Sequence, residues 1–180
     1  MQIEVPIPYV VEAEPAMEWL MDEPVQKVSP VYDHSFWQRK LAEELGNWGR
    51  LRGRTGSEWR FWIAPSFGPA CYLVPDVAFV SFDRLPKGAP RDAIREPRLA
   101  PDIVVEILSP RDRNVLVQHK INVYLSGGTE LVIVLDPEQR IVTLHDREYS
   151  LTIGETDIVT HRSMPGFVLA LAPLFEEMDV

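Results

Sequence analysis

The sequence has few of the features that define the special classes of protein. Its 180 residues include a single cysteine, Cys71, which excludes an internal disulfide and a zinc site built from several thiolates. No apolar run approaches the roughly 20 residues of a membrane-spanning helix, and the N-terminus lacks the basic-then-apolar pattern of a signal peptide. We therefore expect a cytoplasmic protein with no membrane segment, in which Cys71 is a small buried residue.

Positive charge is also scarce. Eighteen Lys and Arg stand against 27 Asp and Glu, which gives a net charge of −9. An acidic surface repels the phosphate backbone, which argues against a general nucleic-acid-binding protein. The net charge is nevertheless uneven: it is −6 over residues 1–33, +4 over residues 34–98 and −7 over residues 99–180. Within the basic stretch, Arg91, Arg95 and Arg98 fall in a proline-containing loop and are candidate contacts to a nucleic-acid backbone, or else form a solvated loop surface.

The composition, with 46% hydrophobic and 25% charged residues, is that of an ordinary globular chain. A chain of this length buries roughly 70% of its unfolded surface, which is enough for one hydrophobic core. We find no internal repeat and no linker. We assign residues 1–27 to an N-terminal extension that is partly helical, with a short helix over residues 15–21, and residues 28–180 to the folded domain.

Hydrophobic periodicity predicts a mixed α/β fold. An apolar stripe at helical spacing predicts a first long helix after Ser29-Pro30, formed by Trp37, Leu41, Leu45 and Trp48. Residues 58–64 and 71–81 are predicted to be two strands of a hairpin, the second interrupted by Pro75.

The second half of the chain begins with a strand-helix-strand unit. Residues 102–108 (DIVVEIL) and 131–136 are apolar runs typical of buried strands, and residues 114–126 between them have helical spacing. This order predicts two adjacent parallel strands with a right-handed crossover. Short antiparallel strands over residues 140–168 and a final helical turn over residues 172–177 complete the prediction.

Three side chains in this framework suggest chemistry. Glu106 lies inside an apolar strand, where a carboxylate needs a cation, hydrogen bonds or a proton. Asp76 follows Pro75 in another apolar run, and the kink would let its carboxylate face a neighbouring strand. Two such acids can share Mg²⁺, which prefers oxygen ligands and is usually held by one or two carboxylates plus water. Lys120, on the helix that follows Glu106, could orient or deprotonate a water or stabilise charge on phosphorus.

Five segments of the chain occur in a characteristic order: LVPDVAFV, PDIVVEILSP, HKINVYLSGG, LVIVLDPEQRIVTL and MPGFVLALAPLF. Over roughly residues 28–175 they resemble the Uma-type restriction endonuclease family of the PD-(D/E)XK nuclease superfamily. It implies a restriction-endonuclease-like core, with a central mixed β-sheet flanked by helices and additional antiparallel strands.

The resemblance also implies roles for individual residues. Asp76 and Glu106 would be metal ligands, and the backbone carbonyl of Ile107 would be a third. In the superfamily's plain pattern a lysine stands two residues after the glutamate, where this chain has Leu108. The family resembled here places the lysine on the next helix, which makes Lys120 the matching residue.

Other positions follow the resemblance less closely. The family's Glu-Leu-Ile-Asp-Gly-like segment is replaced by EWLMDEPVQKVSP, so neither Glu18 nor Asp22 is assigned a role. His34 matches a position where histidine is common in the family, and it would either contact a scissile phosphate or cap the helix.

The leading hypothesis is therefore a Mg²⁺-dependent endonuclease acting on DNA, with Mn²⁺ as a substitute metal. A homodimer is expected, because cleavage of two strands needs two sites. The alternative is a catalytically inactive nuclease fold that serves as a binding or oligomerisation module, and a solvent-facing Lys120 would favour it. Hydrolysis of RNA or of a small phosphoester would use the same three residues.

Overall fold

A six-stranded mixed sheet lies at the centre of the computed structural model, which describes residues 13, 15–112 and 114–180. In sheet order its strands are β10 (Ser150–Gly154), β9 (Ile141–His145), β8 (Leu131–Asp136), β7 (Ile103–Ile107), β6 (Val77–Ser81) and β3 (Gly53–Ser57). The described residues also form three two-stranded pairs: β1 (Met17–Leu20) with β2 (Glu23–Gln26), β4 (Phe61–Ile63) with β5 (Cys71–Leu73), and β11 (Ile158–Val159) with β12 (Leu169–Ala170). The helices in the described part of the chain are α1 (Tyr32–Gly49), α2 (Arg91–Arg95), α3 (Asn114–Gly127) and α4 (Ala172–Met178).

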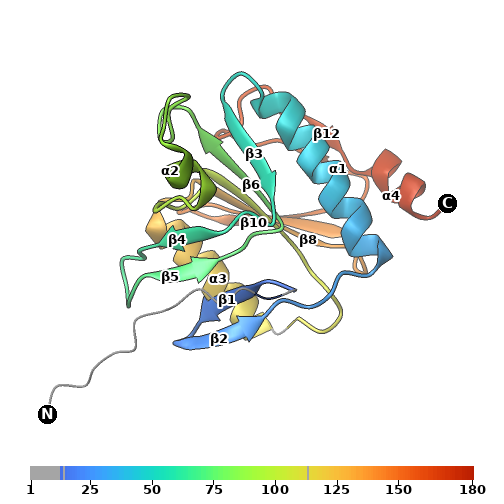
Figure 1. Cartoon of the computed structure of the whole chain (residues 1–180). Helices are drawn as coiled ribbons and strands as arrows, with labels where there is room; N and C mark the ends of the chain where they lie inside the picture. The colour runs from blue at the N-terminus through green and yellow to red at the C-terminus, as the bar shows by residue number, and fades with distance from the viewer. Residues whose placement is uncertain (1–12, 14, 113) are drawn as a thin grey trace, which may run out of the picture.

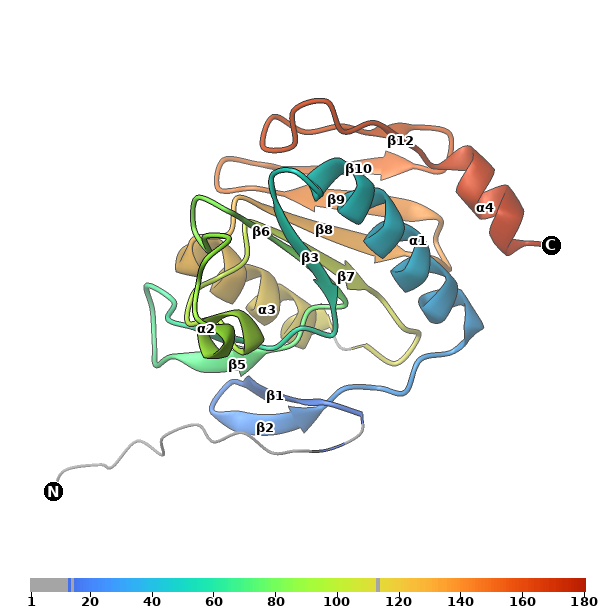
Figure 2. The same cartoon turned by 45° about the horizontal axis from the view of Figure 1, so that its top comes forward.

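The central sheet is covered on both faces, α1 lying over one and α3 over the other (Figures 1 and 2). Successive side chains of a strand point to opposite faces, so each central strand contributes to two cores. On β7, Val105 packs in the core beneath α1 and Val104 in the core beneath α3, both at most 1% exposed. Each such side chain contributes about 1.5–3 kcal/mol on burial. The predicted mixed α/β architecture is confirmed.

The predicted strand-helix-strand unit, with two adjacent parallel strands, is confirmed. Strands β7 and β8 pair in parallel, with Glu106 opposite Val134, and α3 forms the connection between them. The first long helix is also found, with Trp37 and Leu45 at most 2% exposed against the sheet. The later antiparallel strands and the C-terminal helix lie where the sequence predicts them. Cys71 is buried, as expected.

The short helix predicted over residues 15–21 is wrong. Met17–Leu20 is a strand that pairs with Glu23–Gln26 in an antiparallel hairpin. Met21 and Asp22 connect the two strands, both with positive φ, which is the conformation of a two-residue hairpin turn. That turn usually carries Asn-Gly or Asp-Gly, so Met-Asp gave no turn signal. The remainder of the predicted extension, residues 1–12, lies outside the described residues.

The single strand predicted over residues 71–81 is in fact two strands. Cys71–Leu73 forms the predicted hairpin with Phe61–Ile63, whereas Val77–Ser81 enters the central sheet between β3 and β7. Pro75 lies at the point where the chain passes from one sheet to the other, because proline has no N–H for a ladder hydrogen bond. Strand β3, whose sequence Gly-Arg-Thr-Gly-Ser lacks apolar alternation, was not predicted.

The pairing of β3 with β6 gives a testable expectation for Gly53. This residue lies opposite Ser81, and a Cβ added to it would lie 2.2 Å from the carbonyl oxygen of Val80 and 2.6 Å from the ring of Phe79. We expect Gly53→Ala to lower the free energy of unfolding by about 1–3 kcal/mol. The control is Gly46→Ala in α1, where nothing lies within 4 Å, and it should raise that free energy by about 0.5–1 kcal/mol. Urea unfolding followed by circular dichroism measures both, and equal stabilities would contradict the expectation.

Candidate active site

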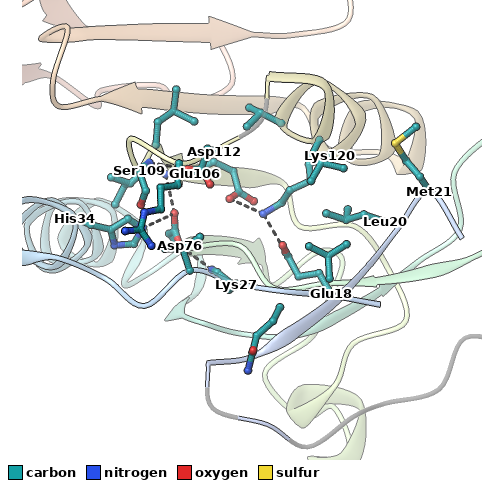
Figure 3. A pocket seen from close by; sticks show the side chains of 18 of the residues that line it. Glu18, Leu20, Met21, Lys27, His34, Asp76, Glu106, Ser109, Asp112 and Lys120 are labelled. Carbon is teal, nitrogen blue, oxygen red and sulfur yellow. Dashed lines mark hydrogen bonds and ion pairs between the residues drawn. The ribbon is translucent and has the colours of Figure 1, made fainter. Parts of the chain in front are cut away.

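A cavity of about 520 Å³ lies beside the central sheet where β6 begins and β7 ends. The β1–β2 hairpin, the start of α1 and one side of α3 contribute to its walls (Figure 3). Its lining includes all three residues that the sequence singled out for chemistry, Asp76, Glu106 and Lys120. The fold therefore brings them together, although they are separated by up to 44 positions in the chain.

Asp76 is placed by the break between the two sheets. It stands between Pro75 and the first residue of β6, Val77, which pairs with Val105 of β7. Extending this antiparallel register by one residue sets Asp76 opposite Glu106. Opposed residues of antiparallel strands lie on the same face, which explains why two acids so distant in sequence share one cavity.

Glu106 faces α3 from the end of β7. Its Oε2 accepts a hydrogen bond from Nζ of Lys120 at 2.7 Å, and its Oε1 accepts one from the Tyr124 hydroxyl at 2.8 Å. Lys120 and Tyr124 are four residues apart and so lie on the same side of α3. Glu106 is 7% exposed and Lys120 is 8% exposed, so this hydrogen-bond set satisfies a buried carboxylate.

The β1–β2 hairpin adds two charged groups to the cavity that the sequence analysis did not assign. Oε1 of Glu18 lies 3.0 Å from Nζ of Lys120 and accepts the backbone N–H of Val74 at 2.8 Å. Nζ of Lys27 donates to Oδ1 of Asp76 at 2.7 Å. The acid of the hairpin thus pairs with the lysine of the core, and the lysine of the hairpin pairs with the acid of the core.

One sequence signal could have drawn attention to Lys27. It is the single cation among residues 1–33, a segment that also carries seven acids. The signal for Glu18 is weaker, because an acid beside Trp19 and Leu20 is unusual only if the segment is known to be a buried strand. Both side chains were missed because their partners, Lys120 and Asp76, lie far away in sequence.

The carboxyl groups of Asp76 and Glu106 have shifted pKa values in opposite directions. Burial disfavours ionisation of Asp76, but the Lys27 ammonium and the hydrogen bond from His34 outweigh it and lower the pKa. At Glu106 burial outweighs the attraction of Lys120, and the Asp76 carboxylate adds to it, so the pKa is raised. Asp76 is therefore firmly ionised, whereas Glu106 can exchange a proton near neutral pH.

Lys120 remains an ammonium in this arrangement. Burial lowers its pKa, but the carboxylates of Glu106 and Glu18 raise it by more. Of the roles open to Lys120, this favours hydrogen-bond donation and electrostatic stabilisation over acceptance of a proton from water.

His34 also reaches the site, from the first turn of α1. Its Nε2 lies 3.3 Å from Oδ2 of Asp76, and that same oxygen accepts the backbone N–H of Ile107 at 2.7 Å. Burial lowers the pKa of His34, but the interactions with Asp76 raise it by more. Nδ1 of His34 is buried with no hydrogen-bond partner in the described part of the chain. Its contact with a scissile phosphate stays a prediction.

The predicted nucleic-acid contacts Arg91, Arg95 and Arg98 are all exposed, and none of them lines the cavity. The first two belong to α2, which packs on Trp59 through a hydrogen bond from the indole Nε1 to the carbonyl of Ile94. Any contact they make would be to DNA that extends beyond the cavity, and their role stays a prediction.

The donor set fits a single divalent cation. Among the described residues no group of three or more His, Cys, Asp and Glu side chains could hold a metal ion. Asp76 and Glu106 would therefore need a backbone oxygen and water as further ligands, which is the usual coordination of Mg²⁺ in proteins. Ile107 lines the cavity, as its predicted carbonyl ligand requires. Three buried carboxylates, those of Glu18, Asp76 and Glu106, line the cavity together with the ammonium groups of Lys27 and Lys120. The carboxylate of Glu58 is 43% exposed and contacts Lys27 from outside this lining.

Comparison with known families places this geometry in context. Residues 4–172 match the Uma2 family, described as "Putative restriction endonuclease". The chain belongs to the Uma2 family. Membership confirms the resemblance found in the sequence and supports a nuclease. Because the Uma2 match begins at residue 4, it includes the β1–β2 hairpin that carries Glu18 and Lys27.

A solved structure shares the fold. It is a protein from Anabaena variabilis, described as a "putative nuclease belonging to DUF820", with 24% sequence identity and a TM-score of 0.81 over 94% of each chain. Comparison with curated proteins gives no significant match. In the described part of this Uma2 family member, none of the helices has the length and apolar character needed to cross a membrane.

Proposed function

We propose that the protein is a metal-dependent endonuclease that hydrolyses DNA phosphodiester bonds in the cavity between β7, α3 and the β1–β2 hairpin. Asp76, Glu106 and the carbonyl of Ile107 would hold Mg²⁺, for which Mn²⁺ can substitute. Bound there, the cation would supply Lewis acidity at a phosphoryl oxygen. Family membership supports the nuclease activity, and the metal, the substrate and the residue roles belong to the proposal.

The observation that carries the proposal is the position of Lys120. Its Nζ lies inside the cavity, 2.7 Å from Glu106 and 3.0 Å from Glu18. A lysine facing solvent would have favoured a binding or oligomerisation module. A buried ammonium held by two carboxylates instead supports a role in which it would donate to a phosphoryl oxygen, where negative charge develops during attack.

The residues around Lys120 have distinct roles in this proposal. Glu18 and Glu106 fix the ammonium from two sides, so that its remaining N–H can donate to a water or to a phosphoryl oxygen. The Tyr124 hydroxyl fixes the second oxygen of Glu106. The acidic net charge of −9 opposes DNA binding, so binding should be weak and strongly dependent on salt.

The test is relaxation of supercoiled plasmid by purified protein at low salt, with Mg²⁺, Mn²⁺ or EDTA. We expect nicking with either metal and none with EDTA. Glu106→Gln, which keeps the size of the side chain and an acceptor oxygen for Lys120 but removes the negative charge, should abolish it. Nicking that survives EDTA, or that Glu106→Gln retains in full, would overturn the proposal. Parallel assays on RNA and on a small phosphodiester decide the substrate class, with DNA expected to be hydrolysed fastest.

We also propose a homodimer as the form that cuts both strands of a duplex, because each chain has one such cavity and symmetric dimers are the commonest assembly. Analytical ultracentrifugation with and without DNA tests this, and a monomer under both conditions would contradict it.

A further inference from the structure

Lys27 is held in an unusual environment for a lysine near the protein surface. Its backbone N–H donates to the carbonyl of Ala16 at 2.9 Å, which fixes the residue at the end of the hairpin. Its side chain is 12% exposed and turns inward, and Figure 3 shows it beside Asp76. This orientation is costly for a flexible charged side chain unless the ammonium is fully paired.

Three oxygen atoms surround the ammonium of Lys27. Oδ1 of Asp76 lies at 2.7 Å, the carbonyl oxygen of Val74 at 2.8 Å and a carboxylate oxygen of Glu58 at 3.1 Å. Three N–H donors thus meet three acceptors. Two carboxylates and one backbone carbonyl are also the ligand types that a hard divalent cation takes in proteins.

The cage that these three oxygens form around the Lys27 ammonium is joined to the rest of the site by hydrogen bonds. The N–H of Val74 donates to Glu18, and the backbone N–H of Glu58 donates to the carbonyl oxygen of Asp76 at 3.3 Å. Gln38 of α1 donates to a carboxylate oxygen of Glu58 at 2.8 Å. The three residues that carry these oxygens lie outside the hairpin. Each would keep a hydrogen-bond partner if the ammonium of Lys27 were removed: Glu18 for Val74, the N–H of Ile107 for Asp76, and Gln38 for Glu58.

We propose that these three oxygens form a cation site, which the Lys27 ammonium fills from within the chain, and that a divalent cation and this ammonium compete for it. The inference rests on the proposed function in one respect, the assignment of Asp76 as a metal ligand. Lys27 thereby limits how tightly, or how many, divalent ions the cavity binds.

The test replaces the ammonium and measures metal binding without DNA. Lys27→Met keeps the unbranched apolar stem of the side chain and removes the ammonium. Mn²⁺ should therefore bind at least about tenfold more tightly, or one further ion should bind, since a unit charge within about 4 Å is lost. Isothermal titration with MnCl₂ gives affinity and stoichiometry, and electron paramagnetic resonance counts the bound Mn²⁺. Adding Glu58→Gln to Lys27→Met should remove the gain, because it removes one carboxylate of the cage.

Two further variants keep the test decisive. Lys27→Gln is neutral but can still donate to Val74 and Asp76, so it carries the test if Lys27→Met does not fold. Lys40→Met removes a lysine paired with Glu177 at 2.6 Å outside the cavity, and should leave Mn²⁺ binding unchanged within about twofold.

The inference is overturned if folded Lys27→Met and Lys27→Gln bind Mn²⁺ no more tightly and in no greater number than the wild type, including the case in which none of them binds it. A gain in Mn²⁺ binding without any plasmid nicking would leave the inference standing and reject the proposed function. Plasmid nicking by the wild type, together with Mn²⁺ binding that neither Lys27 variant changes, would overturn the inference and leave the proposed function standing.

Discussion

Replacing Lys120 with methionine should lower the rate of metal-dependent plasmid nicking by about 10²–10³-fold, the usual cost of removing one preorganised donor from a developing negative charge. Methionine fills a similar volume but cannot donate to Glu106 at 2.7 Å, to Glu18 at 3.0 Å or to substrate. Because Asp76 and the end of β7 are unchanged, Mn²⁺ binding should persist. Nicking rates at saturating metal, with titration of Mn²⁺ on the same preparations, measure the two effects separately.

Controls separate this effect from a loss of folding. Lys40→Met, on α1 and outside the cavity, should nick at a rate within about twofold of the wild type. If Lys120→Met is unfolded, Lys120→Arg keeps a positive charge between the two carboxylates, and its larger planar head should still impair nicking by moving the donor. A folded Lys120→Met that nicks at the wild-type rate would show that Lys120 is not a catalytic residue.

The second large effect is on stability. Asp76→Ala removes the partner of three groups at once: the Lys27 ammonium, the backbone N–H of Ile107 and His34. Breaking a buried ion pair on one side leaves an uncompensated charge, so the free energy of unfolding should fall by about 3–5 kcal/mol. For a chain of this size that corresponds to a melting temperature lower by roughly 6–20 °C. Thermal and urea unfolding followed by circular dichroism measure it.

Matched variants identify the cause of that loss. Glu177→Ala removes an acid that is 49% exposed and pairs with Lys40, and it should cost only about 0–1 kcal/mol. Adding Lys27→Met to Asp76→Ala should restore part of the lost stability, because the double variant no longer has an ammonium that has lost its buried carboxylate partner. If Asp76→Ala costs no more than Glu177→Ala, the buried pair does not stabilise the fold.

Much of the fold could be predicted because its signals are local. The apolar run around Glu106 and the helical spacing before Gly127 each depend on neighbouring residues, and together they fix a parallel β7–β8 pair with α3 as the crossover. The strand Gly53–Ser57 has no such signal. It is polar and rich in glycine, and it is a strand because Val77–Ser81 offers it a free edge to pair with.

The sequence also indicated part of the candidate site, namely its acids and one lysine, but not the partners of these groups. An acid inside an apolar run signals a need for partners, which is why Asp76 and Glu106 could be named without a structure. Lys120 could be named because it lies on the helix that follows Glu106 and matches the family's lysine, and the fold brings all three to one cavity. The partners themselves could not be read in the same way. Glu18 reaches Lys120 across 102 positions, and Lys27 reaches Asp76 across 49, through a hairpin whose Met-Asp turn has no recognisable sequence signal.

The sequence by itself determined the α/β architecture, because burial and periodicity are properties of short segments. Its resemblance to the family's segments gave the family to which the chain belongs, and it singled out Asp76, Glu106 and Lys120 as candidates. The tertiary structure alone decided how those charges are paired. Pairing depends on distances of about 3 Å between groups from different elements, which the sequence does not give. These distances determine which carboxylate is ionised and which ammonium lies in the proposed cation site.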